Sequence, residues 1–434
     1  MRNKYRKIGD FIEKVNIKNN EGIYLNLQGI NIDKFFMPSV ANTVGVDLKK
    51  YKIIKKGQFA CNRMHVGRDY RIPIALSKDE TPFIVSPAYD VFQIKDETQL
   101  APEYLMMWFS RKEFDRNAWF YTDADVRGGL PWVSLINIEL PVPSIEKQRE
   151  IVKEYNTIVN RIKLNETLNQ KLEDTAQALY KHWFVDFNFP ITKESCPELV
   201  SGSPELEGKP YKSSGGEMVF NEELDVEIPV GWEKGVFGDV VETINGFAFK
   251  SFDFSSEGDY PILKIKNIQP PLVSIDESQF YNNILNDKLK RVIIEKGDTL
   301  ITMTGSGANQ INSAVGQVGR YYFNTPSLLN QRVCKLLPKY NQVKQFAYLF
   351  ISQEEKHLEL LAGSSGSANQ ANISPDQIKN LRIVLPKEKV LIAFESKISL
   401  LFNYKSVQQQ IYLQKFKDLI LSKMSKLETK AAVV

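Results

Sequence analysis

The chain repeats itself once, and this internal duplication constrains its fold more than any other feature of the sequence. Four short segments recur in the same order in the two halves, with similar spacing between them. Self-similarity of this kind means that one structural unit is used more than once. The sequence therefore predicts two domains of the same fold. The matching pairs are residues 8–13 with 237–242, 51–57 with 291–297, 104–110 with 346–352, and 140–143 with 383–386.

Each half opens with a region of about 130 to 160 residues, a size that suits one packed domain. Short runs of β-branched and aromatic residues alternate there with Gly, Asn and Pro turns, which is typical of mixed α/β structure. Of the 434 residues, 43% are hydrophobic and 25% charged, enough apolar surface for more than one core. The formal net charge of +4 permits a polyanion partner without requiring one.

A long helix is predicted after each globular region. Ser144 is a suitable N-cap, Glu146 suits the first-turn dipole, and the next proline is Pro190. A helix from Ile145 to Trp183 would be roughly 58 Å long, more than a small domain can bury. The second helix is expected from Lys387 to about Leu427.

Both predicted helices carry an apolar stripe, which Asn165 and Asn169 interrupt in the first. Two unrelated helices, each packing on its own domain, would explain either stripe alone. The shared position in the repeat favours mutual pairing instead, as two long antiparallel helices that separate the globular halves. The stripes are Ile151, Ile158, Ile162, Leu168, Leu172, Ala176 and Leu179, and Phe394, Ile398, Leu401, Ile411, Phe416, Leu419 and Ile420.

Catalytic motifs are weak or incomplete. The Pro270-Pro271 pair lacks the neighbouring amide and aromatic side chains that hold a flipped base in DNA methyltransferases. Gly202 to Lys209 departs from a phosphate loop in spacing, and it lies in the Ser-, Gly- and Pro-rich stretch that is read as a linker. A loose nuclease-like string, Asp376 with Glu395 and Lys397, places its last two members in a predicted helix, so a nuclease remains only a weak alternative.

Metal and cofactor signals are equally sparse. Cys61, Cys196 and Cys334 show no metal-ligand spacing, which predicts neither a zinc site nor a disulfide framework and favours a reducing compartment. His65, His182 and His357 belong to no nucleophile motif. The N-terminus has no apolar signal core, and no segment has the length of a membrane span. We expect a protein without catalytic residues, metal or cofactor of its own.

Glycine-containing loops with base-reading side chains occur at corresponding places in the two halves. Residues 62–71 and 127–129 in the first half correspond to 304–310 and 366–372 in the second. Arginine suits guanine and phosphate, while asparagine and glutamine suit adenine. Ordinary polar turns would explain any one loop. The predicted DNA-contacting residues are Arg63, His65, Arg68, Tyr70, Arg71, Arg127, Ser306, Asn309, Gln310, Arg320, Asn369 and Gln370.

Three segments resemble a known family. AQALYKHWFVDF at residues 176–187 is similar to the end of the central conserved helix in the specificity subunits of type I restriction-modification systems. PYKSSGGEM at 210–218 and IPVGW at 228–232 resemble that family's entry to its second recognition domain. The resemblance covers essentially the whole chain.

The resemblance implies a division of labour along the chain. Residues 1–143 and 231–386 would be two target recognition domains that read a split double-stranded DNA site. Residues 144–186 and 387–434 would be conserved helices that act as spacers, and 187–230 a linker. Two methyltransferase subunits would dock on the helices and restriction subunits would join them. The predicted docking residues are Ile158, Ile162, Leu172, Leu179, Leu401 and Ile411.

The family's chemistry would belong to those partners. S-adenosylmethionine, ATP and magnesium are expected on the partner subunits, in the cytoplasm, and not on this chain. A coiled-coil scaffold that binds peptides or glycans and a standalone DNA-binding regulator remain as alternatives to the specificity subunit.

Overall fold

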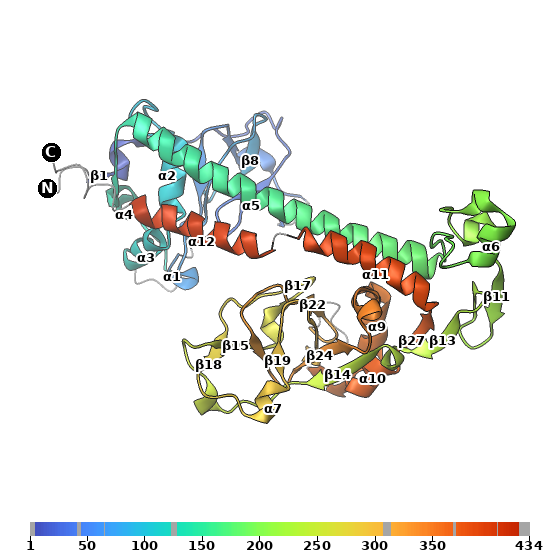
Figure 1. The fold of residues 1–434 in the computed structure, drawn as a ribbon. Coiled ribbons are helices and arrows are strands. Elements are labelled where there is room, and N and C mark those ends of the chain that lie inside the picture. Colours follow the sequence, from blue (N-terminus) through green and yellow to red (C-terminus); the bar gives the residue numbers. More distant parts are fainter. Residues whose placement is uncertain are drawn as a thin grey trace, which may run out of the picture. The chain divides into compact units, whose positions relative to one another are not determined.

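A computed structural model describes residues 5–40, 45–64, 66–122, 128–306, 314–367, 370–405 and 407–424. The chain divides into two compact units, residues 1–164 with 411–434, and residues 165–410. Helices and short strands alternate in both, so the fold is mixed α/β (Figure 1).

The first unit is built on a four-stranded antiparallel sheet of order β2-β9-β6-β7, with two-stranded pairs β1–β10, β5–β8 and β3–β4. Its strands are β1 (Tyr5–Lys7), β2 (Ile12–Val15), β3 (Gln28–Ile30), β4 (Phe36–Pro38), β5 (Lys52–Ile54), β6 (Phe59–Cys61), β7 (Ile74–Leu76), β8 (Phe83–Val85), β9 (Asp90–Ile94) and β10 (Glu139–Pro141). Its helices are α1 (Val66–Asp69), α2 (Pro102–Phe109), α3 (Lys112–Phe120) and α4 (Trp132–Asn137), with short 3-10 turns at Ile8–Asp10 and Leu48–Lys50.

The second unit contains a six-stranded sheet of order β14-β24-β20-β22-β17-β16 and a four-stranded sheet of order β18-β15-β23-β19. Its strands are β11 (Met218–Asn221), β12 (Val226–Pro229), β13 (Glu233–Val236), β14 (Val241–Asn245), β15 (Tyr260–Leu263), β16 (Ile268–Gln269), β17 (Leu272–Val273), β18 (Gln279–Tyr281), β19 (Ile293–Ile294), β20 (Thr299–Thr302), β21 (Thr304–Gly305), β22 (Val318–Arg320), β23 (Ser327–Leu329), β24 (Val333–Pro338), β25 (Ser365–Ser367), β26 (Gln370–Asn372) and β27 (Arg382–Leu385).

The second unit contains six α-helices outside α5 and α12 in its described residues, and the first two of them are short. The six are α6 (Pro197–Gly202), α7 (Asp287–Lys290), α8 (Lys344–Ile351), α9 (Glu354–Ala362), α10 (Pro375–Lys379) and α11 (Glu388–Asn403). Short 3-10 turns lie at Pro204–Leu206, Lys212–Ser214, Phe237–Asp239, Ser251–Asp253, Ile265–Asn267 and Asn341–Val343.

The two units share one topology, as the internal repeat predicted. The order β2-β9-β6-β7 in the first corresponds to β14-β24-β20-β22 in the second, and every pairing within both is antiparallel. The pairs β1–β10 and β5–β8 recur as β13–β27 and β19–β23, also antiparallel. Helices α2, α3 and α4 recur as α8, α9 and α10 at the same places in the chain.

The turn at Gly57 and Gly297 explains why the two halves keep matching residues at this position. Gly57 and Gly297 both adopt positive φ, 80° and 94°, at the turn that leads into β6 and β20. Glycine adopts this region without the steric cost that a Cβ atom brings. The Lys-Gly match between the halves therefore marks the same structural position in each.

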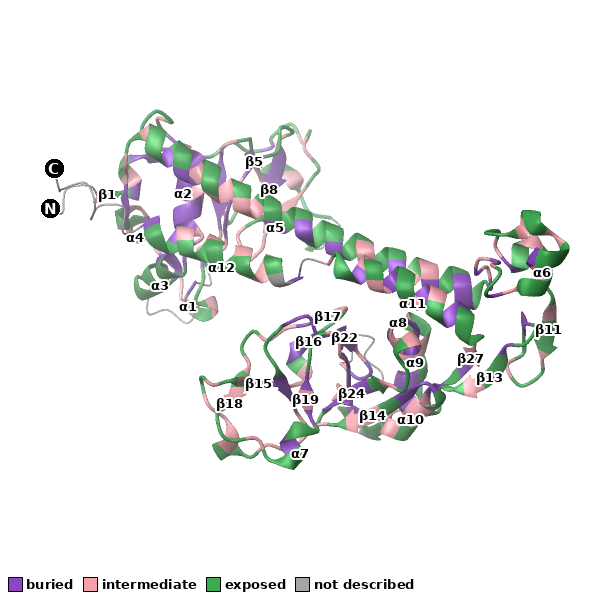
Figure 2. Cartoon of the chain, in the orientation of Figure 1, coloured by how far each residue is buried: buried purple, intermediate pink, exposed green. Residues whose placement is uncertain are grey.

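A single long helix, α5 (Ile145–Tyr180), spans 36 residues and continues into a π-helical turn at Lys181–Val185. Residues 145–164 of α5 belong to the first unit and the rest to the second. The Ser144 hydroxyl accepts a bond from the Lys147 amide at 3.4 Å, as expected of an N-cap. Buried and exposed residues alternate along the helix (Figure 2).

Within each unit α5 packs against the C-terminal part of the chain. In the first, Ile151 lies in one core with Leu421 and Met424. In the second, Glu173 pairs with Lys405 while Tyr180, further along α5, contacts Phe394, an earlier residue of the partner helix. The partner number falls as the α5 number rises, which confirms antiparallel pairing.

The second helix differs from the prediction because it is interrupted. Instead of one helix from Lys387 to Leu427, α11 ends at Asn403 and α12 (Val407–Lys423) begins after a break. The Tyr404 and Lys405 amides donate to carbonyls three residues back, a tighter turn than an α-helix. The apolar stripe has no member at residues 405–410 except Val407, so the core gives little support to a continuous helix there.

The buried face of α5 also differs from the predicted stripe. Leu168 is 42% exposed, whereas Asn165, Asn169 and Glu173 are buried. Both asparagine amides face Gln409 and Gln410 at 3.4 Å, so hydrogen bonding lets polar residues occupy the seam. The asparagines therefore belong to the stripe that they were expected to interrupt.

The expected linker at residues 187–230 is folded. It contains α6 and the β11–β12 hairpin, and its apolar residues enter the core of the second unit. The Phe189 ring stacks on Tyr211 at 4.6 Å and on Trp232 at 5.0 Å. The Ser-, Gly- and Pro-rich composition hid these aromatic anchors, which are spaced too irregularly to show a periodic pattern.

Candidate nucleic-acid interface

Two of the glycine-containing loops meet in the first unit. The loop between β6 and β7 approaches the segment before α4, where the Gly67 amide donates to the Gly128 carbonyl at 2.7 Å. A Cβ atom on Gly67 would lie 2.7 Å from the Gly128 Cα, so both glycines are needed for this approach. The Leu130 amide donates to the Arg63 carbonyl at 2.9 Å, which closes the junction.

The corresponding loops meet in the second unit. After β20, strand β21 pairs antiparallel with β26, with Thr304 opposite Asn372 and Gly305 opposite Ala371. Strand β25 completes this small sheet. Segments that lie far apart in the sequence are thus joined at the same topological position in both units.

The first-unit loop is tied down by a buried ion pair. The Ile72 amide donates to the Asp115 carboxylate at 3.2 Å, and Lys34 Nζ contacts the same carboxylate oxygen at 2.7 Å. Burial lowers the pKa of Lys34 although Asp115 opposes this shift. Asp115 therefore holds the end of the loop against α3.

Exposed cationic and aromatic side chains project from this loop. The Arg68 side chain is 65% exposed beside Asp69, and Arg71 lies 2.9 Å from the Asp33 carboxylate at the surface. Tyr70 is exposed, with a left-handed φ of 55° that non-glycine residues rarely adopt. These three predicted residues are accessible to a large ligand.

Arg63 has a different environment from its neighbours. Its guanidinium lies 2.6 Å from Asp90 and 5.8 Å from the Trp132 ring, and it also donates to the Leu130 carbonyl. Burial would raise the pKa of Asp90, but hydrogen bonds from Lys14 and Arg63 outweigh burial and lower it. Arg63 thus stabilises the junction of the loops, and its expected DNA contact stays a prediction.

Arg320 disagrees with the prediction most clearly. It is 2% exposed, its guanidinium donates to Gln345, and it lies 4.8 Å from the Tyr348 ring and 5.0 Å from the Phe402 ring. A side chain in this position cannot touch DNA. Arginine is usually exposed in proteins, but Arg320 lies on β22, an inner strand of the six-stranded sheet.

The second-unit loops present amides and hydroxyls. Ser306 is half-buried, and the exposed Gln370 donates to the Asn372 side chain at 3.3 Å. The other predicted contacts, His65, Arg127, Asn309, Gln310 and Asn369, lie outside the described residues.

A buried polar cluster, which the sequence did not reveal, joins α8 to α5 and to the segment after α11. The Glu173 carboxylate of α5 pairs with Lys405 and accepts a bond from the Tyr348 hydroxyl at 2.7 Å. Burial lowers the pKa of Lys405 even though Glu173 opposes this shift. The spacing of Glu173, four residues after Asn169 on the seam, was the only available signal.

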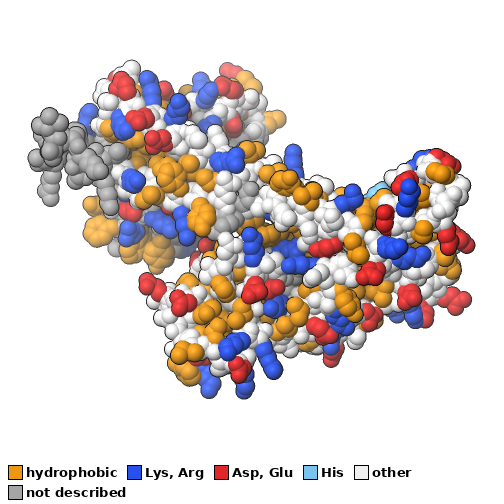
Figure 3. Space-filling view, viewed as in Figure 1, with side chains coloured by type: hydrophobic (Ala, Val, Ile, Leu, Met, Phe, Trp, Pro, Cys, Tyr) orange, Lys and Arg blue, Asp and Glu red, His pale blue; other side chains and the backbone are white. Residues whose placement is uncertain are grey.

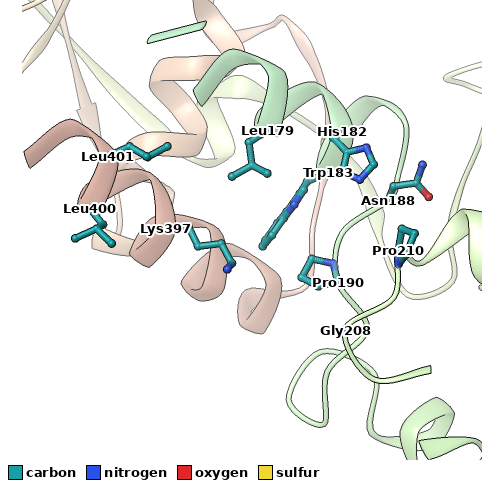
Figure 4. A pocket seen from close by; sticks show the side chains of 10 residues that line it. All are labelled: Leu179, His182, Trp183, Asn188, Pro190, Gly208, Pro210, Lys397, Leu400 and Leu401. Carbon is teal, nitrogen blue, oxygen red and sulfur yellow. The ribbon is translucent and has the colours of Figure 1, made fainter. Parts of the chain in front are cut away.

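The helices leave apolar side chains exposed. Leu164, Leu168, Ile392, Leu400, Phe416 and Leu419 are all exposed. A groove of about 540 Å³ lies beside α11 and the end of α5, lined by Leu179, Trp183, Lys397, Leu400 and Leu401 among others (Figure 4).

The predicted docking residues are less accessible than these. Ile162 is buried, and Leu179 and Leu401 partly pack against the core while lining the groove. Ile158, Leu172 and Ile411 are half-buried. Of the predicted docking residues, Leu179 and Leu401 therefore line the groove, and whether any of the six contacts a partner stays a prediction.

The described part of the chain gives no support to a metal site or to the nuclease-like string. There, no three His, Cys, Asp or Glu side chains gather as the ligands of a metal ion would. Glu395, from the nuclease-like string, accepts bonds from the Gln345 amide at 2.8 Å and the Ser399 hydroxyl at 2.9 Å. Among the helices of the described residues, none has the length and apolar character needed to cross a membrane.

Comparison with known proteins gives consistent results. Residues 229–426 match the family model of the type I restriction modification DNA specificity domain. The chain is 23% identical to the type I restriction enzyme HindI specificity subunit of Haemophilus influenzae, in an alignment of 449 positions that covers 93% of each protein. It is 24% identical to the MjaIX specificity subunit of Methanocaldococcus jannaschii, covering 74% of this chain and 68% of that protein.

The fold has a solved counterpart. A crystal structure of the type I restriction-modification S subunit from M. genitalium superposes with a TM-score of 0.53 and 13% identity, over 98% of this chain and 97% of that one. Over most of its length the chain is therefore similar to type I restriction enzyme specificity subunits, and its residues 229–426 match the DNA specificity domain of that family.

Proposed function

We propose that this chain reads a bipartite DNA target for a type I restriction-modification complex and has no catalytic chemistry of its own. The observation that carries the proposal is that two loops meet at the same topological position in both units, with different side chains in each. A duplicated scaffold with divergent loops suits two half-sites of different sequence. The two recognition domains of this proposal are residues 1–143 and 231–386.

The loop chemistry suggests how each half-site would be read. Arg68 and Arg71 can donate to guanine or to phosphate oxygens, whereas Gln370 and its neighbours suit adenine. Binding by the first domain should therefore depend more strongly on salt, because each cation that replaces a counterion on the DNA adds to the salt dependence.

The helices would hold the catalytic partners. We assign the exposed apolar face of α11 and the groove of Figure 4 to a methyltransferase subunit. Covering a face rich in Leu and Ile removes apolar surface from water, which favours binding. A second methyltransferase subunit and the restriction subunits would complete the complex. S-adenosylmethionine, ATP and magnesium would bind those partners.

The test is to co-express the chain with its methyltransferase in a host that lacks other adenine methylation, and to map methylated adenines across the genome. We expect one split motif of two defined parts with a fixed spacer. Gel-shift assays should show sequence-specific affinity that is higher with the methyltransferase than without it. Specific binding without any partner would favour a regulator, absence of DNA binding a scaffold, and magnesium-dependent cutting by the pure chain a nuclease.

A further inference from the structure

Four exposed aromatic side chains lie together on the first unit and are not explained by its core. They are Tyr70, Trp119, Phe120 and Tyr121, named here the aromatic patch. The Tyr70 and Trp119 rings are 5.3 Å apart, and the Phe120 and Tyr121 rings are 5.2 Å apart in an edge-to-face arrangement. Grouped aromatic surface of this kind is unfavourable in water and marks a place where another molecule binds.

The aromatic patch adjoins the loop that carries Arg68 and Arg71. Helix α1, which is part of that loop, contacts α3, whose last turn bears Trp119 and Phe120. Asp115 of α3 holds the loop at the Ile72 amide. The left-handed backbone at Tyr70 brings its ring against Trp119, a costly conformation of a kind that clusters at functional sites.

The charges around the aromatic patch favour DNA as its occupant. Arg68, Arg71 and Arg116 are exposed beside it, each near a surface carboxylate that a phosphate can replace. Figure 3 shows hydrophobic and basic side chains side by side over the region where α1 and α3 lie in Figure 1. Arginines that flank apolar rings suit a ligand with charged edges and flat stacked faces.

We propose that the aromatic patch binds duplex DNA and that Phe120 inserts between neighbouring base pairs of the first half-site. Phe120 is the most exposed of the four rings, at 75%, and has no polar atom to satisfy. Apolar side chains that enter a base step unstack it partly and bend the duplex. The ease of bending depends on sequence, so the first domain would select base steps that no side chain reads directly. This inference rests on the proposed function.

The experiment uses the full chain in complex with its methyltransferase and a duplex that contains the mapped motif. 2-Aminopurine is placed at successive positions of the first half-site away from the methylated adenine, because its fluorescence rises when stacking is lost. We expect a rise at one base step with the unaltered complex. Phe120→Ala should abolish that rise and weaken binding roughly tenfold, in the range seen for lost stacking contacts.

Two further variants distinguish insertion of the Phe120 ring, called the wedge below, from an unspecific effect of losing an exposed aromatic ring. Phe120→Leu keeps an apolar side chain and should retain part of the fluorescence rise. Phe220→Ala removes a ring of comparable exposure, 57%, from β11 of the second unit, and should change neither fluorescence nor affinity.

The outcomes that overturn the inference differ from those that overturn the proposed function. If the unaltered complex binds its motif but no position brightens, or if Phe120→Ala brightens equally, the wedge is wrong while the specificity function stands. If Phe120→Ala loses the methyltransferase and leaves DNA stacking unchanged, the aromatic patch is a protein interface. Failure of the unaltered complex to bind the motif removes the proposed function and the inference together.

Discussion

Single residues decide how the second domain is attached to its helices. The Glu173 carboxylate is buried, and its charge is balanced by Lys405 with help from the Tyr348 hydroxyl. A buried pair of this kind adds little stability compared with apolar residues, but a lone buried charge is very costly. The pair therefore mainly sets the register in which residues of α5 face the segment after α11.

Lys405→Met should lower the free energy of unfolding by about 3–5 kcal/mol, because it leaves Glu173 buried without a cation. Urea unfolding followed by circular dichroism measures this loss. The double variant Glu173→Leu with Lys405→Met should recover most of it. Lys266→Met, which breaks the exposed pair with Glu277, serves as the control and should cost less than about 1 kcal/mol. Equal losses for Lys405 and Lys266 would contradict the role of the buried pair.

The buried thiols predict a loss of stability at alkaline pH. Burial raises the pKa of Cys61 to about 12, with a smaller contribution from Asp90, and burial raises the pKa of Cys334 to about 12. In the unfolded chain both titrate near 9, so between pH 9 and 12 the unfolded state loses protons that the folded state keeps. Stability is thus full below pH 9 and falls as the pH rises toward 12.

Urea midpoints at pH 8 and pH 10.5 measure this effect. The midpoint should fall at the higher pH, and the fall should be smaller in a variant with both Cys61→Ala and Cys334→Ala, since alanine has no proton to lose. Burial also raises the pKa of tyrosines such as Tyr104 and Tyr180, and these residues account for the fall in midpoint that remains in the cysteine variant. A midpoint difference that the cysteine variant does not change would exclude the thiols as its source.

At this scale the sequence predicted chemistry better than accessibility. Arg68, Tyr70 and Arg71 are exposed as a DNA contact requires, yet Arg320, the same residue type as Arg68, is buried under aromatic rings. Whether an arginine points outward depends on which strand becomes central in the sheet. That depends on pairings between residues far apart in the chain, such as Thr299 with Leu336.

Elements with long and regular sequence patterns were predicted best, whereas some short or irregular elements were missed. Helix α5 follows from 36 residues without proline, and the matching segments predicted the two domains of one fold that the shared strand order shows. The break before α12 was not predicted because the mostly polar residues at 405–410 do not by themselves mark the end of a helix. The folded segment at 187–230 was missed because aromatic anchors such as Phe189 and Tyr211 find each other only in three dimensions.

The outward face of α11 should carry the affinity for the methyltransferase. Leu400 is 57% exposed at the groove, so Leu400→Asp should leave folding intact while placing a charge in an apolar interface. We expect at least a tenfold loss of methyltransferase affinity, measured by co-purification and by isothermal titration. Leu25→Asp alters a leucine of greater exposure on the first unit and should have no effect. Unchanged affinity of the Leu400 variant would move the docking surface elsewhere.

At the scale of the whole molecule, the duplication places two units of one topology on a single chain. Helix α5 begins in the first unit and ends in the second without interruption, so the number of residues in it is a length written into the chain. If that length sets the separation of the half-sites, the spacer in the DNA target should change when the helices change. Changing the loops alone should alter the bases that are read and leave the spacer as it is.

Duplicating residues 158–164 of α5 together with 411–417 of α12 tests this directly, since seven residues add nearly two turns and so keep the packing face within about 20°. The insertion lengthens the helices by about 10 Å, the rise of roughly three base pairs. Methylation of a randomised-spacer library should therefore shift to a spacer about three base pairs longer, with both half-site sequences unchanged. Duplicating only one of the two segments breaks the pairing and should abolish methylation. A library that keeps its original spacer with both duplications would show that the helices hold the methyltransferase but do not measure the DNA.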